Sequence, residues 1–129
     1  MTSDRHIIGT GEAPEAIGPY SQGVRHGTLL FCSGQIPIDP ETDELVSGSI
    51  GEETTRCMNN LEAVCHAAGT TLDRAMRLTI YTTELESFAE INEAYGAFFA
   101  DEPPARAAVG VAALPKGARV EVDAIVAVW

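Results

Sequence analysis

The chain has 129 residues, 45% of them hydrophobic and 21% charged, which is typical of one globular domain and excludes an intrinsically disordered chain. Nineteen acidic residues against eight Lys and Arg give a net charge of −11. The basic residues are scattered, which argues against a nucleic-acid partner, because binding to phosphates requires a cluster of cations.

The sequence has no apolar segment of the ~20 residues that a membrane span needs, and its N-terminus lacks the apolar core of a signal peptide. We therefore expect a single domain over residues 1–129, located in the cytoplasm and without a membrane partner. Three cysteines and three histidines are dispersed, with no CxxC and no zinc-binding spacing, so we expect no metal site.

Three strands are predicted in the first third of the chain, at residues 4–8, 21–26 and 28–33. The third contains a near-continuous apolar run, which is typical of a strand covered on both faces. The segment DPETDEL at 39–45 is rich in turn-forming residues and is expected to be a loop.

Two helices alternate with a fourth strand in the middle of the chain. Over 51–68 apolar residues repeat at helical spacing, and Gly69 suits the position just after a helix. RLTIYTT at 77–83 has the β-branched content of a strand. A second helix is expected to begin at Ser87, whose spacing to Glu90 fits a capping box. Its apolar stripe is interpreted as core rather than as a ligand cage: Phe88, Ile91, Tyr95 and Phe98.

The last two strands are predicted to form an antiparallel hairpin around LPKG at 114–117. Pairing Ala113 with Ala118 places valines on one face and charged residues on the other, whereas a one-residue slip would set valines against charges. Arg106 and Glu121 then share a face, with Cα atoms on the order of 14 Å apart given ~3.4 Å rise and ~4.8 Å strand spacing. That gap is too wide for a tight ion pair and suits a small molecule held between the two charged groups.

The predicted order of elements, β-β-β-α-β-α-β-β, indicates an α+β fold with a mixed β-sheet and both helices on one face. The opposite face of the sheet also needs a cover. In a chain of this size the natural cover is another copy of the same chain.

Four segments together resemble one protein family: AIGPYSQG at 16–23, SGQIPIDPETDE at 33–44, INEAYGAFF at 91–99 and PARAAVGVAALPKGARVEVDAIV at 104–126. In this order and spacing they resemble the RidA/YjgF family of small trimeric imine deaminases, also called L-PSP endoribonucleases. The resemblance spans essentially the whole chain. Each motif alone is weak, but the set is specific.

The resemblance implies a fold similar to chorismate mutase of the Bacillus type, in which three subunits pack as a homotrimer around a barrel-like core. It also implies a ligand site in each cleft between subunits. The implied activity is hydrolysis of 2-iminopropanoate or 2-iminobutanoate to the 2-oxo acid and ammonia, without a cofactor. Pyridoxal-phosphate dehydratases acting on serine or threonine release such imines.

By the same resemblance, Arg106 stands for the family's carboxylate-binding arginine, since a guanidinium group can hold a carboxylate by two parallel hydrogen bonds. Glu121 stands for the glutamate that orients or activates the attacking water. Taken from the residues alone, Arg106 also fits an edge arginine in a surface ion pair, and Glu121 fits an outward strand residue in solvent.

The resemblance further implies a substrate-binding role for Tyr20, Ser33, Gly34 and Asn92. A phenol can hydrogen-bond the substrate or water, and a glycine lets the backbone approach a ligand closely. The alternatives are an ordinary loop tyrosine at Tyr20, a simple turn at Gly34, and an asparagine at Asn92 that bonds a neighbouring loop.

The chain departs from the family pattern in two places. Ala108 stands where the family often has a cysteine, which removes thiol chemistry there and leaves the scheme of Arg106 and Glu121 intact. The loop ADEPP at 100–104 is shorter than in the best-known deaminases and carries two extra acids, Asp101 and Glu102. These acids could change which imines enter.

The sequence therefore predicts an imine deaminase. The main alternative is a trimeric module that binds or senses 2-oxo acids without turnover. Arg106 serves both functions, whereas Glu121 matters chiefly to the enzyme. An endoribonuclease is disfavoured by the net charge and by the absence of a histidine pair suited to RNA cleavage.

Overall fold

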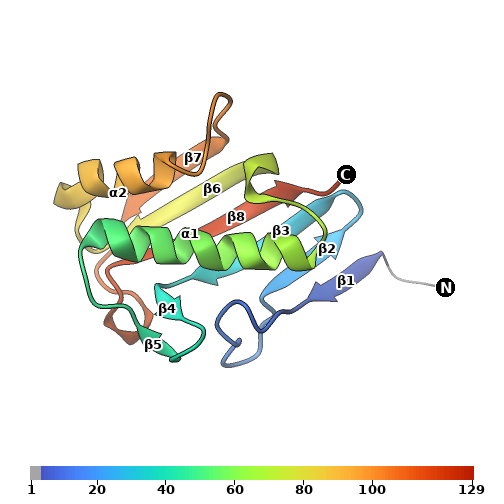
Figure 1. Cartoon of the computed structure of the whole chain (residues 1–129), viewed down its shortest axis with the longest axis horizontal. Coiled ribbons are helices and arrows are strands. Elements are labelled where there is room, and N and C mark those ends of the chain that lie inside the picture. Colours follow the sequence, from blue (N-terminus) through green and yellow to red (C-terminus); the bar gives the residue numbers. More distant parts are fainter. Residues whose placement is uncertain (1–3) are drawn as a thin grey trace.

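A six-stranded mixed sheet forms one layer of the molecule (Figure 1). The structure is a computed structural model, described here for residues 4–129. The strand order is β1-β2-β3-β8-β6-β7, and all neighbouring pairs are antiparallel except β6 and β7, which are parallel. The strands span β1 Arg5–Ile8, β2 Gly23–His26, β3 Leu29–Gln35, β6 Ala75–Thr82, β7 Ala105–Gly110 and β8 Val120–Ala127.

Two helices, α1 Ile50–Ala67 and α2 Phe88–Gly96, lie side by side on one face of this sheet (Figure 1). The predicted α+β class, with a mixed sheet and two helices, is confirmed. The remaining elements are short: the hairpin of β4 Ile38–Asp39 and β5 Glu44–Leu45, and the 3-10 turns η1 Leu72–Arg74, η2 Leu85–Ser87 and η3 Pro115–Gly117. The segment 39–45, expected to be a loop, thus contains the turn of a small hairpin and most of its two short strands.

Helix α1 begins at a complete capping box. The Ser49 hydroxyl accepts a hydrogen bond from the backbone N–H of Glu52 at 3.1 Å, and the Glu52 carboxylate accepts one from the N–H of Ser49 at 3.0 Å. Gly69, with φ +82°, follows the helix in the left-handed region that glycine adopts without strain. The helix therefore starts and ends within one residue of the predicted range 51–68.

The capping box predicted for the second helix is wrong. Ser87 does precede α2, but its side chain caps nothing, and the Glu90 carboxylate instead accepts a hydrogen bond of 2.9 Å from the N–H of Gly51. The N-terminus of α1, where Gly51 lies, carries a partial positive charge that favours a carboxylate there. Glu90 therefore links the two helices.

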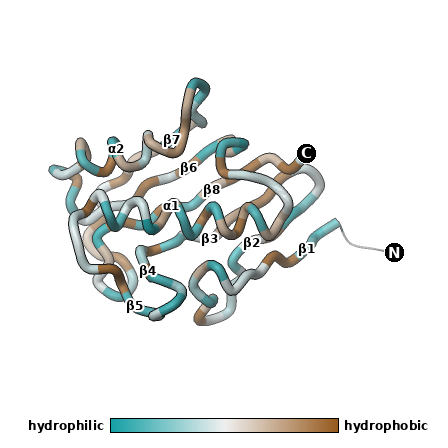
Figure 2. The backbone as a smooth tube through the Cα atoms, in the orientation of Figure 1, coloured by the Kyte–Doolittle hydropathy of each residue, from teal (hydrophilic) through white to brown (hydrophobic). Residues whose placement is uncertain are grey.

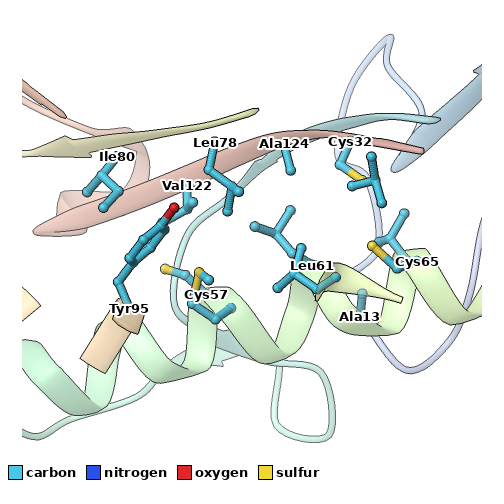
Figure 3. Packing of buried hydrophobic residues seen from close by; sticks show 14 of the residues in the cluster. Ala13, Cys32, Cys57, Leu61, Cys65, Leu78, Ile80, Tyr95, Val122 and Ala124 are labelled. Atoms are coloured by element: carbon cyan, nitrogen blue, oxygen red, sulfur yellow. The ribbon is translucent and has the colours of Figure 1, made fainter. Parts of the chain in front are cut away.

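The core lies between α1 and the sheet (Figure 3). The hydropathy of α1 alternates along its length, as expected for a helix with one face on a core (Figure 2). Fully buried side chains come from α1 and from the strands β3, β6 and β8: Cys57, Met58, Leu61, Val64, Cys65, Leu30, Leu78, Ile80, Val122 and Val126.

The predicted hairpin of the last two strands is also wrong. β7 and β8 do not pair with each other, because β6 lies between them and pairs with both. The segment between β7 and β8 holds the C-terminal end of β6: the N–H of Val111 donates to the carbonyl of Thr82 at 2.9 Å, and the N–H of Thr83 donates to the carbonyl of Arg119 at 3.1 Å. Alternation along a strand specifies which residues share a face, but it does not specify the neighbouring strand.

The face of the sheet away from the helices, called here the open face, has no cover in a single copy. It carries half-exposed apolar side chains, among them Phe31 at 44% and Val109 at 40% exposure. Residues of β3, β6, β7 and β8, including Tyr81 and Ile125, line a shallow depression of about 460 Å³ on this face. A patch of this kind on a small domain is typical of an interaction surface.

Candidate functional site

The side chain of Glu121 lies on the open face of β8 and packs against Gly34 of β3. The pairing of β3 with β8 shifts register between Cys32 and Gln35, so Gly34 lies in a bulge. A Cβ added to Gly34 would lie 2.9 Å from the carboxylate carbon of Glu121, closer than real contacts allow. The glycine is therefore needed for Glu121 to occupy this position.

Glu121 is a half-buried carboxylate without a partner. Within residues 4–129 it makes no hydrogen bond and no ion pair. Burial, and to a smaller extent the neighbouring charge of Asp123, raise the pKa of Glu121 above its usual value. Asp123 itself accepts a hydrogen bond of 3.1 Å from the Tyr81 hydroxyl. A carboxylate with a raised pKa is suited to accept and return a proton.

Ser33 precedes Gly34 in β3, and Tyr20 lies close to the same glycine. The Ser33 hydroxyl donates to the carbonyl of Ser21 at 2.6 Å, which ties the loop of Tyr20 to the strand of Gly34. Tyr20 and Gly34 line a common cavity of about 200 Å³. We call Tyr20, Ser33, Gly34 and Glu121 the carboxylate half-site.

Arg106 of β7 is held by α2. Its guanidinium group donates to the side-chain carbonyl of Asn92, and its central carbon lies 5.1 Å from the ring centroids of both Phe88 and Tyr95. We call Phe88, Asn92, Tyr95 and Arg106 the arginine half-site. None of its partners carries a negative charge, and Arg106 makes no ion pair within the part of the chain that the structure describes.

Asn92 thus accepts a hydrogen bond from Arg106 of β7 rather than bonding a neighbouring loop, and in this way it orients Arg106. The roles of Phe88 and Tyr95 were missed, since their apolar spacing indicated only core. Tyr95 is indeed buried, and burial raises its pKa while Arg106 partly offsets the rise. The signal that could have revealed them is the i, i+4, i+7 spacing of Phe88, Asn92 and Tyr95, which places an amide between two rings on one helix face.

Sequence reasoning also missed a clamp at the start of β8. Arg119, two residues before Glu121, donates from Nε to the nearly buried carboxylate of Glu53 at 2.9 Å and from Nη2 to the carbonyl of Gly48 at 3.0 Å. Its Nη1 lies 3.4 Å from Glu84. Hydrogen bonding to Glu53 raises the pKa of Arg119. The clamp joins β8 to α1 and to the segment that leads into α2.

The two half-sites lie on opposite faces of the sheet, which corrects the expectation that Arg106 and Glu121 share a face. Arg106 pairs with Leu78, whose side chain faces the helices, whereas Glu121 pairs with Tyr81 on the open face. Two strand spacings and three residues separate their Cα atoms by about 14 Å, given ~4.8 Å spacing and ~3.4 Å rise. The distance is as expected, but the side chains diverge, so a single copy does not place both groups on one ligand.

Cys32, Cys57 and Cys65 are buried free thiols, and burial, followed by the charges of Glu121 and Glu53, raises the pKa of Cys57. In the described part of the chain no three His, Cys, Asp or Glu side chains converge as metal ligands would. No helix there is long and apolar enough to cross a membrane.

The fold is a small α+β domain in which, among residues 4–129, Arg106 and Glu121 make no ion pair. The sequence model of the family Endoribonuclease L-PSP matches residues 10–128. A RutC family protein of Sinorhizobium fredii is 49% identical over 92% of this chain and 94% of its own length.

Two further relatives connect the fold to named proteins. The human 2-iminobutanoate/2-iminopropanoate deaminase is 41% identical over 94% of this chain and 88% of its own length. The crystal structure of RidA from an Antarctic Psychrobacter is 41% identical, with a TM-score of 0.91 over 95% of this chain and 99% of that one. The chain therefore belongs to the RidA family, also named Endoribonuclease L-PSP, and the resemblance found in the sequence is confirmed.

Proposed function

We propose that this protein hydrolyses reactive 2-imino acids, such as 2-iminopropanoate and 2-iminobutanoate, to the 2-oxo acid and ammonia in the cytoplasm. The observation that carries this proposal is the presence of two complementary charges without partners: a guanidinium group held only by neutral groups and a carboxylate with a raised pKa. The printed name of the human relative supports the reaction.

The chemistry requires few groups. Arg106 binds the substrate carboxylate by two parallel hydrogen bonds, and Asn92 orients the guanidinium group for them. Glu121 accepts a proton from water as the water oxygen bonds to the imine carbon, and passes this proton to the nitrogen. The C–N bond then breaks, the hydroxyl proton moves to the nitrogen as the carbonyl forms, and ammonia leaves. Tyr20 and Ser33 supply hydroxyls that hold the water or the substrate.

We further propose that each complete site lies between two copies in a homotrimer. Because the half-sites of one copy face opposite sides of its sheet, a ring of copies can bring the arginine half-site of one subunit to the carboxylate half-site of the next. A head-to-tail contact of this kind closes into a ring when its rotation fits. The apolar open face, including Phe31 and Val109, is the surface that the ring would cover.

Mixing two inactive variants tests the shared site. Arg106→Ala and Glu121→Gln are each expected to be nearly inactive. After co-unfolding and refolding in equal amounts, every mixed trimer contains one site with both native residues, so random mixing restores about one quarter of wild-type activity. No recovery, with mixed trimers verified by mass spectrometry, would show that both residues act within one subunit.

Two simpler measurements test the assembly and the reaction. Light scattering at micromolar concentration should give three times the 13.7 kDa chain mass, and a value near 13.7 kDa would contradict the trimer. Ammonia release from an imine generated in situ, with Arg106→Ala as the control, should exceed the uncatalysed rate.

The alternative functions remain distinguishable. A module that only binds 2-oxo acids would show affinity that depends on Arg106 but no ammonia release. The name of the matching family, Endoribonuclease L-PSP, suggests cleavage of RNA. The net charge of −11 disfavours this activity, because it repels the phosphates of RNA. RNA binding that weakens steeply with salt would support that activity instead.

A further inference from the structure

Arg119 is tied to the rest of the molecule by its backbone as well as by its side chain. It lies directly before β8, two residues before Glu121. Its carbonyl accepts one hydrogen bond from the Thr82 hydroxyl at 2.8 Å and another from the N–H of Thr83 at 3.1 Å. The start of β8 is therefore fixed to the end of β6. The proposed reaction makes no direct use of Arg119.

The guanidinium group of Arg119 uses all three of its nitrogens. Two of them, Nε and Nη2, contact the start of α1 through the Glu53 carboxylate and the Gly48 carbonyl. Nη1 lies 3.4 Å from Glu84, the residue directly before η2, which leads into α2. Only 9% of the Glu53 side chain is exposed, so salt screens this ion pair little. One side chain thus joins β8, α1 and the entry to α2.

These contacts lead to both half-sites. On one side, the chain continues from Arg119 into β8 and reaches Glu121 after two residues. On the other side, Glu84 precedes α2, the helix that carries three members of the arginine half-site. The same helix is bonded to α1, because the Glu90 carboxylate accepts from the N–H of Gly51 at 2.9 Å. A change at Arg119 therefore reaches both the carboxylate half-site and the arginine half-site.

An ion network of this kind is better explained by geometry than by stability. Removing two charges from water offsets much of their attraction, and replacing a buried ion pair by apolar side chains is often neutral or stabilising. A guanidinium group, however, donates its hydrogen bonds in fixed directions, so it holds its partners in a defined arrangement. An apolar contact at the same place would stabilise the fold without fixing the direction of β8.

We propose that Arg119 is a positioning residue for the reaction. Through its backbone it sets the place of Glu121, and through Glu84 and α1 it sets the place of the helix that orients Arg106. Arg119 itself touches no substrate in this scheme. The inference rests on the proposed function, because it concerns the two charged groups that the reaction uses.

Three substitutions test the two connections separately. Arg119→Met removes both, so pyruvate binding should weaken and kcat for 2-iminopropanoate should fall ~10- to 100-fold, since a misplacement of about 1 Å can cost 10²-fold in rate. Arg119→Lys keeps the charge but not the planar set of donors, so it should restore only part of the rate. Glu84→Gln weakens only the connection to α2, so KM should rise ~2- to 5-fold, as for a partly exposed ion pair, with kcat unchanged.

The matched control lies at the other end of the same strand. Val126→Ala leaves a cavity in the core and should lower Tm without changing kcat or KM. The inference is wrong if this control loses as much activity as Arg119→Met at an equal loss of Tm. It is also wrong if Arg119→Met keeps the wild-type kcat and KM, because Arg119 would then serve the fold alone.

A measurement without substrate reports the place of Glu121 directly. NMR titration of its side-chain carboxyl carbon should show a lower pKa in Arg119→Met than in wild type, because the carboxylate moves toward solvent. Loss of a cation alone would raise this pKa, and the neighbouring Asp123 and Tyr81 are unchanged in the variant. An unchanged or raised value would overturn the positioning of Glu121. If wild type hydrolyses no imine, the proposed reaction fails, and this titration alone decides the inference.

Discussion

The two half-sites differ in how far the protein satisfies its own charges. In the arginine half-site, an amide and two aromatic rings surround the guanidinium group, and each cation–π contact at an exposed site contributes ~0.5–1 kcal/mol. In the carboxylate half-site, Glu121 has neither a hydrogen bond nor an ion pair within residues 4–129, and its environment disfavours its charged form. The contacts of Arg106 stabilise its charged form without a ligand. The partial burial of Glu121 instead destabilises its charged form.

This difference indicates that Arg106 serves recognition of the ligand and Glu121 serves proton transfer. A cation that is aimed but not neutralised binds an anion without reorganisation, which favours recognition. A carboxylate whose pKa is raised binds protons more readily, which favours proton transfer. Gly34 leaves the space that the Glu121 side chain occupies, and the clamp of Arg119 fixes the chain two residues before Glu121.

The largest expected effect comes from removing the base. Glu121→Gln keeps the shape of the side chain but cannot accept a proton, so kcat should fall ~10²- to 10⁴-fold while affinity for the 2-oxo acid changes little. The acid limb of the wild-type pH profile should lie above the usual range of a glutamate, since activity is lost as pH falls through the raised pKa of Glu121. Full turnover by Glu121→Gln would end the proposed mechanism.

Removing the cation should give a smaller loss that includes binding. Arg106→Ala is expected to lower kcat/KM ~30- to 1000-fold, with weaker 2-oxo acid binding, because the charge-assisted pair exists in both the ground state and the transition state. Arg106→Lys keeps the charge but not the two parallel hydrogen bonds, so it should recover only part of the loss. If Arg106→Ala lowered kcat and left binding unchanged, the two half-sites would not divide recognition from proton transfer.

Giving Arg106 a negative partner should widen the difference between the two half-sites, because the protein would then neutralise the arginine itself. Asn92→Asp places a carboxylate where the amide oxygen now accepts from Arg106, and this carboxylate competes with that of the substrate. KM should rise ~10-fold with little change in kcat, since a charge-assisted hydrogen bond is about twice as strong as a neutral one. Asn92→Ala is the control, and it should disturb the aim of Arg106 without competing with substrate. An unchanged KM in Asn92→Asp would mean that the missing counter-charge is not what the ligand supplies.

The smallest effect concerns stability. The pKa of Glu121 is raised in the folded state relative to the unfolded chain, so the folded state holds this proton more tightly. Stability is therefore lost as pH rises from the unfolded pKa through the folded pKa. Glu121→Gln should raise Tm at neutral pH, and the gain over wild type should shrink on acidification. Thermal unfolding of both proteins across this pH range measures the difference, and a lower Tm for the variant at neutral pH would contradict it.

Particular elements show what could be predicted. Helix α1 was located within one residue, because its apolar period and Gly69 both act locally. The second capping box was wrong because Glu90 has a better partner 39 residues away in Gly51, and no local rule includes that helix end. The site residues were chosen by resemblance, and their grouping into two half-sites became visible only with the fold.

By itself, the sequence determined the elements, the α+β class and the family, since these follow from short-range periodicity and from motifs preserved in order. Only the tertiary structure decided that β6 lies between β7 and β8, and hence that Arg106 and Glu121 face opposite sides. The physical reason is that alternation fixes the two faces of each strand, while the choice of neighbour depends on core packing between segments distant in the chain. That choice separated the two charges in one copy and led to the proposal that a second copy brings them together.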